Sequence, residues 1–279
     1  MKNINYFDVI DEPEKAYWLG FFCADGSLWK NGCQLCIVLS WKDRKHLEKF
    51  AKLFDSPIKK ICSFDKRTNK VYVRARCVLS STHMWKTLVS KGVPVNKTEK
   101  LDGVVLDYIP KTLKSHFVRG YFDGDGSVGK YGKGSRASYR FTLVGTELFL
   151  QAIRDLMVME LGLRRNPVQK RKGVCALVWG GVWALSRIRS WLYCNASIYL
   201  ERKKERFDIV PPKRGTSKYL GVYWDRARSK WVARLYYDGK TRYIGSYNSE
   251  IEAAIAYDET TQKIYGDSAC KNFPTTRNI

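Results

Sequence analysis

The sequence predicts an α+β fold, in which a pseudo-twofold pair of α-β-β-α-β-β-α repeats precedes a small three-stranded antiparallel sheet packed on one helix. Two similar apolar segments, 17–27 and 117–127, each end in Asp-Gly-Ser. The order of strand-like and helix-like runs after the first segment recurs after the second. Beyond residue 216, short aromatic-rich runs precede a single amphipathic run, which predicts the small sheet and its helix.

The two apolar segments have closely similar sequences. Residues 17–27 read YWLGFFCADGS, and residues 117–127 read FVRGYFDGDGS. A proline precedes each segment, Pro13 in one case and Pro110 in the other, and proline favours the first turn of a helix. We therefore expect two equivalent helices, each ending at Asp-Gly-Ser.

The rest of each repeat follows one pattern. After the first segment we expect a strand at 34–41, a helix at 43–54, strands at 58–64 and 71–79, and a helix at 82–91. After the second we expect a strand at 138–144, a helix at 146–161, strands at 167–171 and 174–179, and a helix at 182–193. This series makes 1–104 and 105–210 two repeats of one pseudo-twofold monomer.

Residues 211–216, PPKRGT, have the composition of a linker. The following residues, 217–279, predict a separate domain with strands at 219–224, 230–236 and 241–247 and a helix at 249–265. Ser249 and Glu252 form a capping-box pattern at the start of that helix. The helix residues expected on or near one apolar face are Ile251, Ala254, Ile255, Ala256 and Tyr257.

The charge of the chain indicates a polyanionic partner. The formal net charge is +23. Residues 1–210 hold 38 basic and 20 acidic residues, whereas 217–279 hold ten and seven. So large an excess of positive charge favours nucleic acid first and a membrane surface second. Because the surplus lies in the N-terminal part, we expect that part to bind most of the phosphates.

Other features indicate the cellular compartment. The eight cysteines are scattered through hydrophobic segments, which predicts reduced thiols. The N-terminal residues lack the apolar region of a secretory signal, and no apolar run approaches the roughly 20 residues needed to cross a bilayer. We expect an intracellular protein, in the cytoplasm, an organelle or a phage-infected cell, that is not secreted and has no membrane partner.

The ends of the two apolar helices are the candidate site. Packing the helices together would bring Asp25 and Asp125 side by side at a C-terminal end, where the helix dipole disfavours each carboxylate by about 0.3–1 kcal/mol. A shared divalent cation would offset this cost, and oxygen ligands in a basic surround suit Mg²⁺. The packing would use small residues spaced four apart: Gly20, Ala24, Gly120 and Gly124.

A simpler interpretation assigns the aspartates no chemistry. Asp-Gly would then be only a turn after each helix, with Gly26 and Gly126 as left-handed C-caps. Because the pattern occurs twice, in matching places, we favour the metal site.

Both segments are similar to the motif of the LAGLIDADG homing endonucleases. WLGFFCADG at 18–26 and VRGYFDGDG at 118–126 match it position by position, and the resemblance covers about 1–207. It implies a two-motif, single-chain enzyme whose two four-stranded saddles straddle DNA, with the catalytic metal held by Asp25 and Asp125. Cys23 departs from the motif, where an acidic residue is common, while Asp123 retains it.

The resemblance also implies a lysine in each repeat that orders the attacking water and screens charge on the phosphate. Lys97 and Lys203 occupy the matching places. Lys100 is the alternative in the first repeat, and Arg202 and Lys204 are equally available in the second.

Residues 217–274 resemble the APETALA-two/ERF (AP-two) DNA-binding domain. The matching stretches are YLGV at 219–222, KWVA at 230–233, IGSY at 244–247, EAAIAYD at 252–258 and NFP at 272–274. The resemblance implies a sheet that lies in the DNA major groove. The residues expected to point outward and bind DNA are Trp224, Arg226, Arg228, Lys230, Arg234, Arg242 and Tyr243.

The sequence thus predicts a monomeric, Mg²⁺-dependent, site-specific double-strand DNA endonuclease with an assisting C-terminal DNA-binding domain. By resemblance, its cuts leave 3′ overhangs. Two alternatives remain open. One is an intron RNA maturase on the same scaffold, with RNA as its partner. The other is a transcription regulator led by the C-terminal domain, which leaves the two acidic helix ends unexplained.

Overall fold

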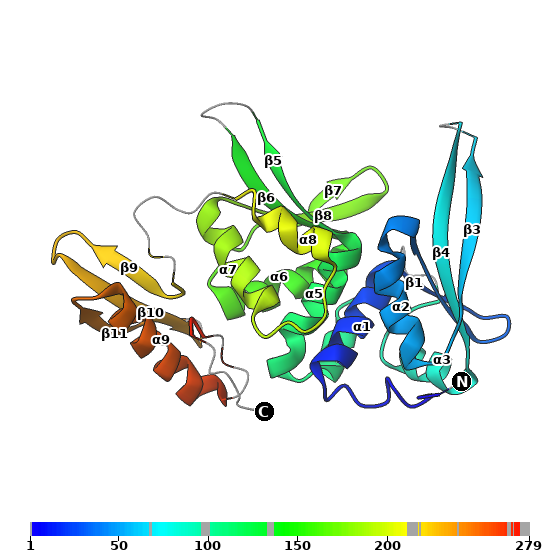
Figure 1. Cartoon of the computed structure of the whole chain (residues 1–279), viewed down its shortest axis with the longest axis horizontal. Coiled ribbons are helices and arrows are strands. Elements are labelled where there is room, and N and C mark those ends of the chain that lie inside the picture. The colour runs from blue at the N-terminus through cyan, green and yellow to red at the C-terminus, as the bar shows by residue number, and fades with distance from the viewer. Residues whose placement is uncertain are drawn as a thin grey trace.

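The structure is a computed structural model that describes residues 2–66, 69–95, 101–132, 137–210, 217, 219–238, 240–266, 269 and 271–273. Within these residues the chain forms two four-stranded sheets with helices packed on them, and a separate three-stranded sheet with one helix (Figure 1). The predicted α+β class, with its paired repeats and its small additional sheet, is confirmed.

The first repeat begins with α1, Pro13–Asp25, whose first residue is the expected proline. Its sheet has the strand order β1-β2-β4-β3, and every neighbouring pair is antiparallel. The other elements are β1 (Gly26–Trp29), β2 (Gln34–Ser40), α2 (Arg44–Leu53), β3 (Ile58–Asp65), β4 (Lys70–Ser80) and α3 (Thr82–Ser90).

The second repeat has the same topology, with strand order β5-β6-β8-β7. A 3₁₀ turn at Lys111–Leu113 follows Pro110 and leads into α5, Lys114–Asp125. The other elements are β5 (Gly126–Tyr131), β6 (Ser138–Gly145), α6 (Glu147–Leu161), β7 (Gln169–Arg171), β8 (Val174–Gly180), α7 (Val182–Tyr193) and the short α8 (Glu201–Lys204).

The strands β1 and β5 start at the residue after each motif aspartate, in a place where the sequence had given no strand boundaries. Gly26 and Gly126 are extended, with φ of −77° and −102°. The interpretation of these glycines as left-handed C-caps is therefore wrong. A Cβ on Gly26 would lie 2.4 Å from the ring of Phe22, and one on Gly126 would lie 2.1 Å from that of Phe122, so glycine lets each chain turn closely past its own helix.

The helices α1 and α5 pack directly against each other through backbone. A Cβ on Gly20 would lie 2.0 Å from the carbonyl oxygen of Phe117, and one on Gly120 would lie 2.0 Å from that of Tyr17. Contacts this short leave no room for any side chain. The two glycines therefore set the distance between the repeats.

One cluster of buried apolar side chains runs through both repeats. The α1 helix contributes Trp18, Phe21 and Phe22, all fully buried, because it is packed between its own sheet and α5. Among the residues that the structure describes, no helix is both long and apolar enough to cross a membrane.

The C-terminal sheet has the order β11-β10-β9, with β9 at Val222–Asp225, β10 at Lys230–Tyr237 and β11 at Lys240–Tyr247. Helix α9, Glu250–Tyr265, packs on this sheet. The predicted capping box is confirmed, because Ser249 Oγ accepts a hydrogen bond from the helix backbone and Glu252 accepts one from the Ser249 N–H.

The face that α9 turns to the sheet differs from the expected one. Ala253 and Ala254 are fully buried, whereas Ile251 and Ile255 are 52% and 45% exposed. Two adjacent alanines let the helix axis lie close to the sheet, and the larger isoleucines then fall on the outer side.

The sequence predicted that all eight cysteines are reduced, and the structure differs from this prediction at one of those that it describes. Cys194, directly after α7, is disulfide-bonded. Of the described cysteines, the free ones are Cys23, Cys33, Cys36, Cys62, Cys77 and Cys175.

Candidate functional site

Asp25 and Asp125 are the last residues of α1 and α5, and both are half-buried. The helix ends meet closely, because a Cβ on Gly124 would lie 2.4 Å from the Cβ of Ala24 and 3.1 Å from Oδ2 of Asp25. The carboxylate of one repeat thus lies beside the residue that precedes the carboxylate of the other. Both sit at the negative ends of their helix dipoles.

Lys203 lies against this pair of helix ends and is only 8% exposed. Its Nζ donates to the carbonyl oxygens of Phe122, Gly124 and Gly126, at 3.5 and 3.3 Å for the first two. Burial, and then the charge of Arg202, lower the pKa of Lys203, while nearby aspartates that include both motif residues act in the opposite direction. The ammonium therefore caps the C-terminal end of α5.

A fully buried carboxylate, that of Asp123, lies near the two half-buried motif aspartates. Asp123 is 1% exposed and accepts hydrogen bonds from Tyr17 Oη at 2.8 Å and from the Leu200 N–H at 2.7 Å. Its Oδ1 has no hydrogen-bond partner among the described residues. Burial raises the pKa of Asp123 to about 7. This residue joins α1, α5 and the segment that carries Lys203, a role that the sequence alone did not indicate.

Buried arginine and histidine extend the network. Arg119 is fully buried and donates to the carbonyls of Ile198 and Leu192, at 2.9 and 2.8 Å, and to Nδ1 of His116 at 2.9 Å. Tyr17 Oη is 2.7 Å from Nε2 of His46. The available sequence signal for this network was an arginine within the apolar run 117–122, FVRGYF.

These histidines have structural roles. Burial lowers the pKa of His46 to about 3 and that of His116 to about 4, so both are neutral. Across the described part of the chain, no three His, Cys, Asp or Glu side chains group so that they could hold a metal ion. Any metal at this site would therefore depend on the two motif aspartates.

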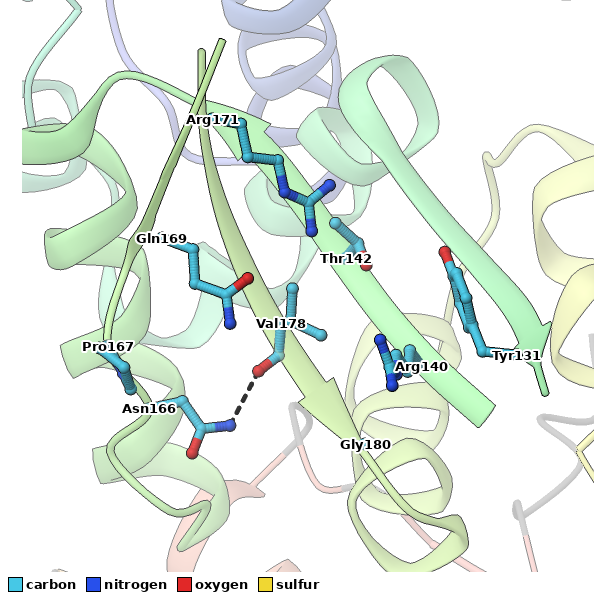
Figure 2. Close-up of a pocket in the computed structure, with 9 residues that line it drawn as sticks. All are labelled: Tyr131, Arg140, Thr142, Asn166, Pro167, Gln169, Arg171, Val178 and Gly180. Carbon is cyan, nitrogen blue, oxygen red and sulfur yellow. Dashed lines mark hydrogen bonds between the residues drawn. The ribbon is translucent and has the colours of Figure 1, made fainter. Parts of the chain in front are cut away.

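The second sheet has a basic open face. Arg140 and Thr142 pair across the sheet with Gly180 and Val178, while the intervening Phe141 is buried on the opposite face. A groove of about 450 Å³ lies on this open face. Figure 2 shows its lining residues, which are Tyr131, Arg140, Thr142, Asn166, Pro167, Gln169, Arg171, Val178 and Gly180.

The first sheet has an equivalent open face. Arg76 pairs with Val38 on one side and with Lys59 on the other, so these three residues share a face. Each repeat also places an arginine over a tyrosine ring. The guanidinium of Arg74 lies 5.9 Å from the ring of Tyr72, and that of Arg140 lies 4.8 Å from the ring of Tyr131. Each repeat therefore presents a basic face, although the arginine–tyrosine pairs come from different strands in the two repeats.

The homing endonuclease I-WcaI, solved bound to its DNA recognition sequence, is similar in structure, with a TM-score of 0.53. The similarity covers 73% of this chain and 90% of that protein, at 13% sequence identity. The paired repeats have the LAGLIDADG endonuclease fold. No family profile matches the chain.

A shorter part of the chain is similar in sequence to plant AP2/ERF proteins. Dehydration-responsive element-binding protein 2H of Arabidopsis thaliana is 42% identical over 65 residues, 23% of this chain and 41% of that protein. The AP2-like ethylene-responsive transcription factor At1g16060, also from Arabidopsis thaliana, is 38% identical over 82 residues, 29% of this chain and 22% of that protein. The chain thus spans less than half the length of either relative.

In the AP2/ERF-like sheet, the face opposite α9 carries three of the expected DNA-binding residues. Ala233 packs on α9, and strand alternation turns Lys230 and Arg234 to the other face. Tyr243 pairs with Arg234 and is 60% exposed.

The other four expected residues lie elsewhere. Trp224 is on the same side as α9, where its ring centroid is 5.1 Å from that of Trp231. Arg242 is on that side too, 5.6 Å from the Tyr237 ring. Both differ from the outward placement expected. Arg226 and Arg228 lie in the turn between β9 and β10, and Arg228 pairs with Asp225 at 3.1 Å.

Some expected residues lie outside the described part of the chain. They are Lys97, its alternative Lys100, and the linker 211–216. The assignment of a water-ordering role to Lys97 stays a prediction.

Proposed function

We propose that this chain is a site-specific double-strand DNA endonuclease whose catalytic carboxylates are Asp25 and Asp125. The observation that carries the proposal is their placement. Backbone packing of α1 against α5 brings the two carboxylates together, and β1 and β5 start at the next residues. The pair therefore lies where the two basic sheets meet.

Double-stranded DNA is the partner that this surface favours. Both open faces combine arginine with polar and aromatic side chains, which suits contacts to phosphates and base edges. The surplus of basic residues in 1–210 supplies the general attraction. The structurally similar I-WcaI is bound to its DNA recognition sequence, which agrees with this assignment.

The donor set fits a divalent cation. Asp25 and Asp125 offer only oxygen ligands, and they stand at helix ends where negative charge is disfavoured without a cation. These two residues would hold Mg²⁺ or a similar ion. Such an ion, when bound, supplies Lewis-acid activation of water and charge neutralisation at phosphate.

Lys203 holds its positive charge beside the two aspartates, through bonds to helix-end carbonyls. A fixed cation there would stabilise the negative charge that builds up on a phosphate during cleavage. Its three backbone partners keep the ammonium in place, so little reorganisation is needed at the moment of reaction. We propose that the AP2/ERF-like domain adds contacts to DNA that flanks the cut site.

Cleavage of a plasmid library in Mg²⁺ tests this function, with DNA binding measured in Ca²⁺. We expect Asp25→Asn and Asp125→Asn to abolish cleavage and to keep DNA affinity within about tenfold, or about 1.4 kcal/mol. Asp107→Asn is the matched control, because Asp107 is an exposed aspartate of the same repeat as Asp125. Cutting by either motif variant at the wild-type rate would show that the assignment is wrong. A wild-type chain that binds DNA and cuts nothing would favour the regulator instead.

A further inference from the structure

The C-terminal domain lies against the second repeat, next to α6 and α7 and at the opposite end of the molecule from the β3–β4 hairpin (Figure 1). Helix α6 ends at Leu161 and is capped by Gly162, which is left-handed with φ of +61°. The ring of Tyr236, on β10, packs on this glycine, and a Cβ at Gly162 would lie 2.8 Å from the ring atoms. Glycine at this position therefore allows both the left-handed end of α6 and the close approach of Tyr236.

Arg187 on α7 joins three elements at this contact. Its Nε donates to the carbonyl oxygen of Leu161, the last residue of α6, at 2.7 Å. Its guanidinium lies 5.3 Å from the ring centroid of Trp183 and 5.9 Å from that of Tyr236. One side chain thus fixes the end of α6 and supports the tyrosine of the C-terminal domain.

A further contact involves the chain that follows α9. Asn195 Nδ2 donates to the carbonyl oxygen of Ala269 at 3.3 Å, and Ala269 is 3% exposed. Burial raises the pKa of Tyr257 and of Tyr265 to about 12, and the charge of Arg187 acts on both in the opposite direction. The interface therefore involves β10 and the segment after α9, and the charge of Arg187 acts on two tyrosines of α9.

We propose that docking through Arg187 holds the C-terminal domain at one position relative to the second repeat, so that the chain reads a flanking DNA element at a single spacing from the cut. This inference rests on the proposed function. It concerns the distance between two DNA elements, which neither the endonuclease fold nor an AP2/ERF-like domain alone would set.

The length of the linker allows an experiment to distinguish a docked domain from a freely tethered one. Six residues, 211–216, can span about 20 Å when extended. Each added base pair moves a flanking element by about 3.4 Å and rotates it by about 34°. A freely tethered domain would follow an element moved by several base pairs. A docked domain would lose it after a shift of one or two.

The test is a cleavage selection with the full-length chain on DNA that carries the core site and a randomised flank. Sequencing of the cut products gives the distance between the cut and any enriched flanking element. The charge reversal Arg187→Glu removes the docking contacts. Arg189→Glu is the matched control, because Arg189 lies on the same helix but pairs with Asp208 at 2.6 Å. The buffer contains a thiol reductant, so that the disulfide at Cys194 is reduced and does not restrict the position of the C-terminal domain.

We expect one spacing for wild type and for Arg189→Glu, and several for Arg187→Glu. A flank moved by one base pair should cost wild type about tenfold in cleavage preference, and the Arg187 variant much less. Gly162→Asn provides a second route if Arg187→Glu does not fold, because asparagine tolerates positive φ and its side chain displaces the Tyr236 ring.

Three results would overturn the inference: several spacings in wild type, a single spacing in the docking variants, or no enriched flanking element. Each of them is obtained with a chain that cuts its core site. Failure of the proposed function is distinct, because wild type would then cut no DNA at all.

Discussion

Arg202, near the end of the second repeat, forms a bidentate ion pair with Asp43 of the first. Arg202 Nε lies 2.9 Å from Oδ1 of Asp43, and Nη2 lies 2.7 Å from Oδ2. Two residues earlier, the Leu200 N–H binds Asp123, and the next residue is Lys203. The short segment that carries Lys203 is therefore fixed to both repeats at once.

Reversing this ion pair tests whether it positions Lys203. We expect Asp43→Arg or Arg202→Asp alone to lower the single-turnover cleavage rate about tenfold at saturating DNA, because each leaves two like charges facing each other. The double variant restores the bidentate pair in the opposite sense and should recover most of the rate. DNA affinity in Ca²⁺ separates positioning from a general change in charge. If the double variant loses cleavage rate by the sum of the two single effects, the ion pair does not position Lys203.

The contact between α1 and α5 predicts a large effect of a small substitution. Gly20→Ala places a Cβ at a position 2.0 Å from the carbonyl oxygen of Phe117, so the helices must separate. We expect the free energy of unfolding in urea to fall by about 3 kcal/mol. Gly180→Ala is the control, because the nearest atom to its added Cβ is 3.7 Å away. Equal stability of the two variants would show that the helix contact is looser than described.

Stability should fall in acid because of the buried histidines. Burial, with the charge of Arg119, lowers the pKa of His116 from 6.5 to about 4. Between these pH values the unfolded chain binds a proton at this residue and the folded chain does not, so the free energy of unfolding falls as the pH falls. The difference between the two pKa values corresponds to about 3 kcal/mol. His46 acts in the same direction, whereas Asp123, with its pKa raised to about 7, acts in the opposite one.

The variant His116→Gln isolates this contribution, because glutamine can still accept the hydrogen bond of Arg119 and does not titrate. Urea unfolding across pH 4 to 6.5 should show a shallower loss of stability in acid than wild type. Identical slopes for the two proteins would mean that His116 is accessible to protons in the folded state.

The sequence predicted the fold well because its signals are local and repeated. Two Asp-Gly-Ser helix ends, matching strand patterns and a capping box at Ser249 need no tertiary information. The strands β1 and β5 were not delimited, since each starts inside the motif at a glycine that reads equally well as a turn. The prediction that Trp224 points away from α9 was also wrong, because a one-residue change of register moves a side chain to the other face of a sheet.

The candidate site was harder to predict in detail. Its aspartates could be named from position alone, yet the burial of Lys203 against helix-end carbonyls depends on residues 77 to 81 positions away. The role of Asp123 likewise arises from contacts with Tyr17 and Leu200, which are distant in sequence. The spacing of residues along the sequence does not predict such contacts.

The last prediction compares two arginines of the C-terminal sheet. Arg234 lies on the face opposite α9, and Arg242 lies on the side of α9 over Tyr237. Both are exposed, and replacing either by alanine changes the net charge by the same amount. We expect Arg234→Ala to weaken binding to DNA that carries the flanking element, and to reduce the slope of log K against log salt by about 1 if Arg234 contacts a phosphate. Arg242→Ala should leave both nearly unchanged. Binding constants of the full-length variants across a salt series provide the measurement. If both substitutions weaken binding equally, general charge and not a reading face accounts for the contribution of this domain.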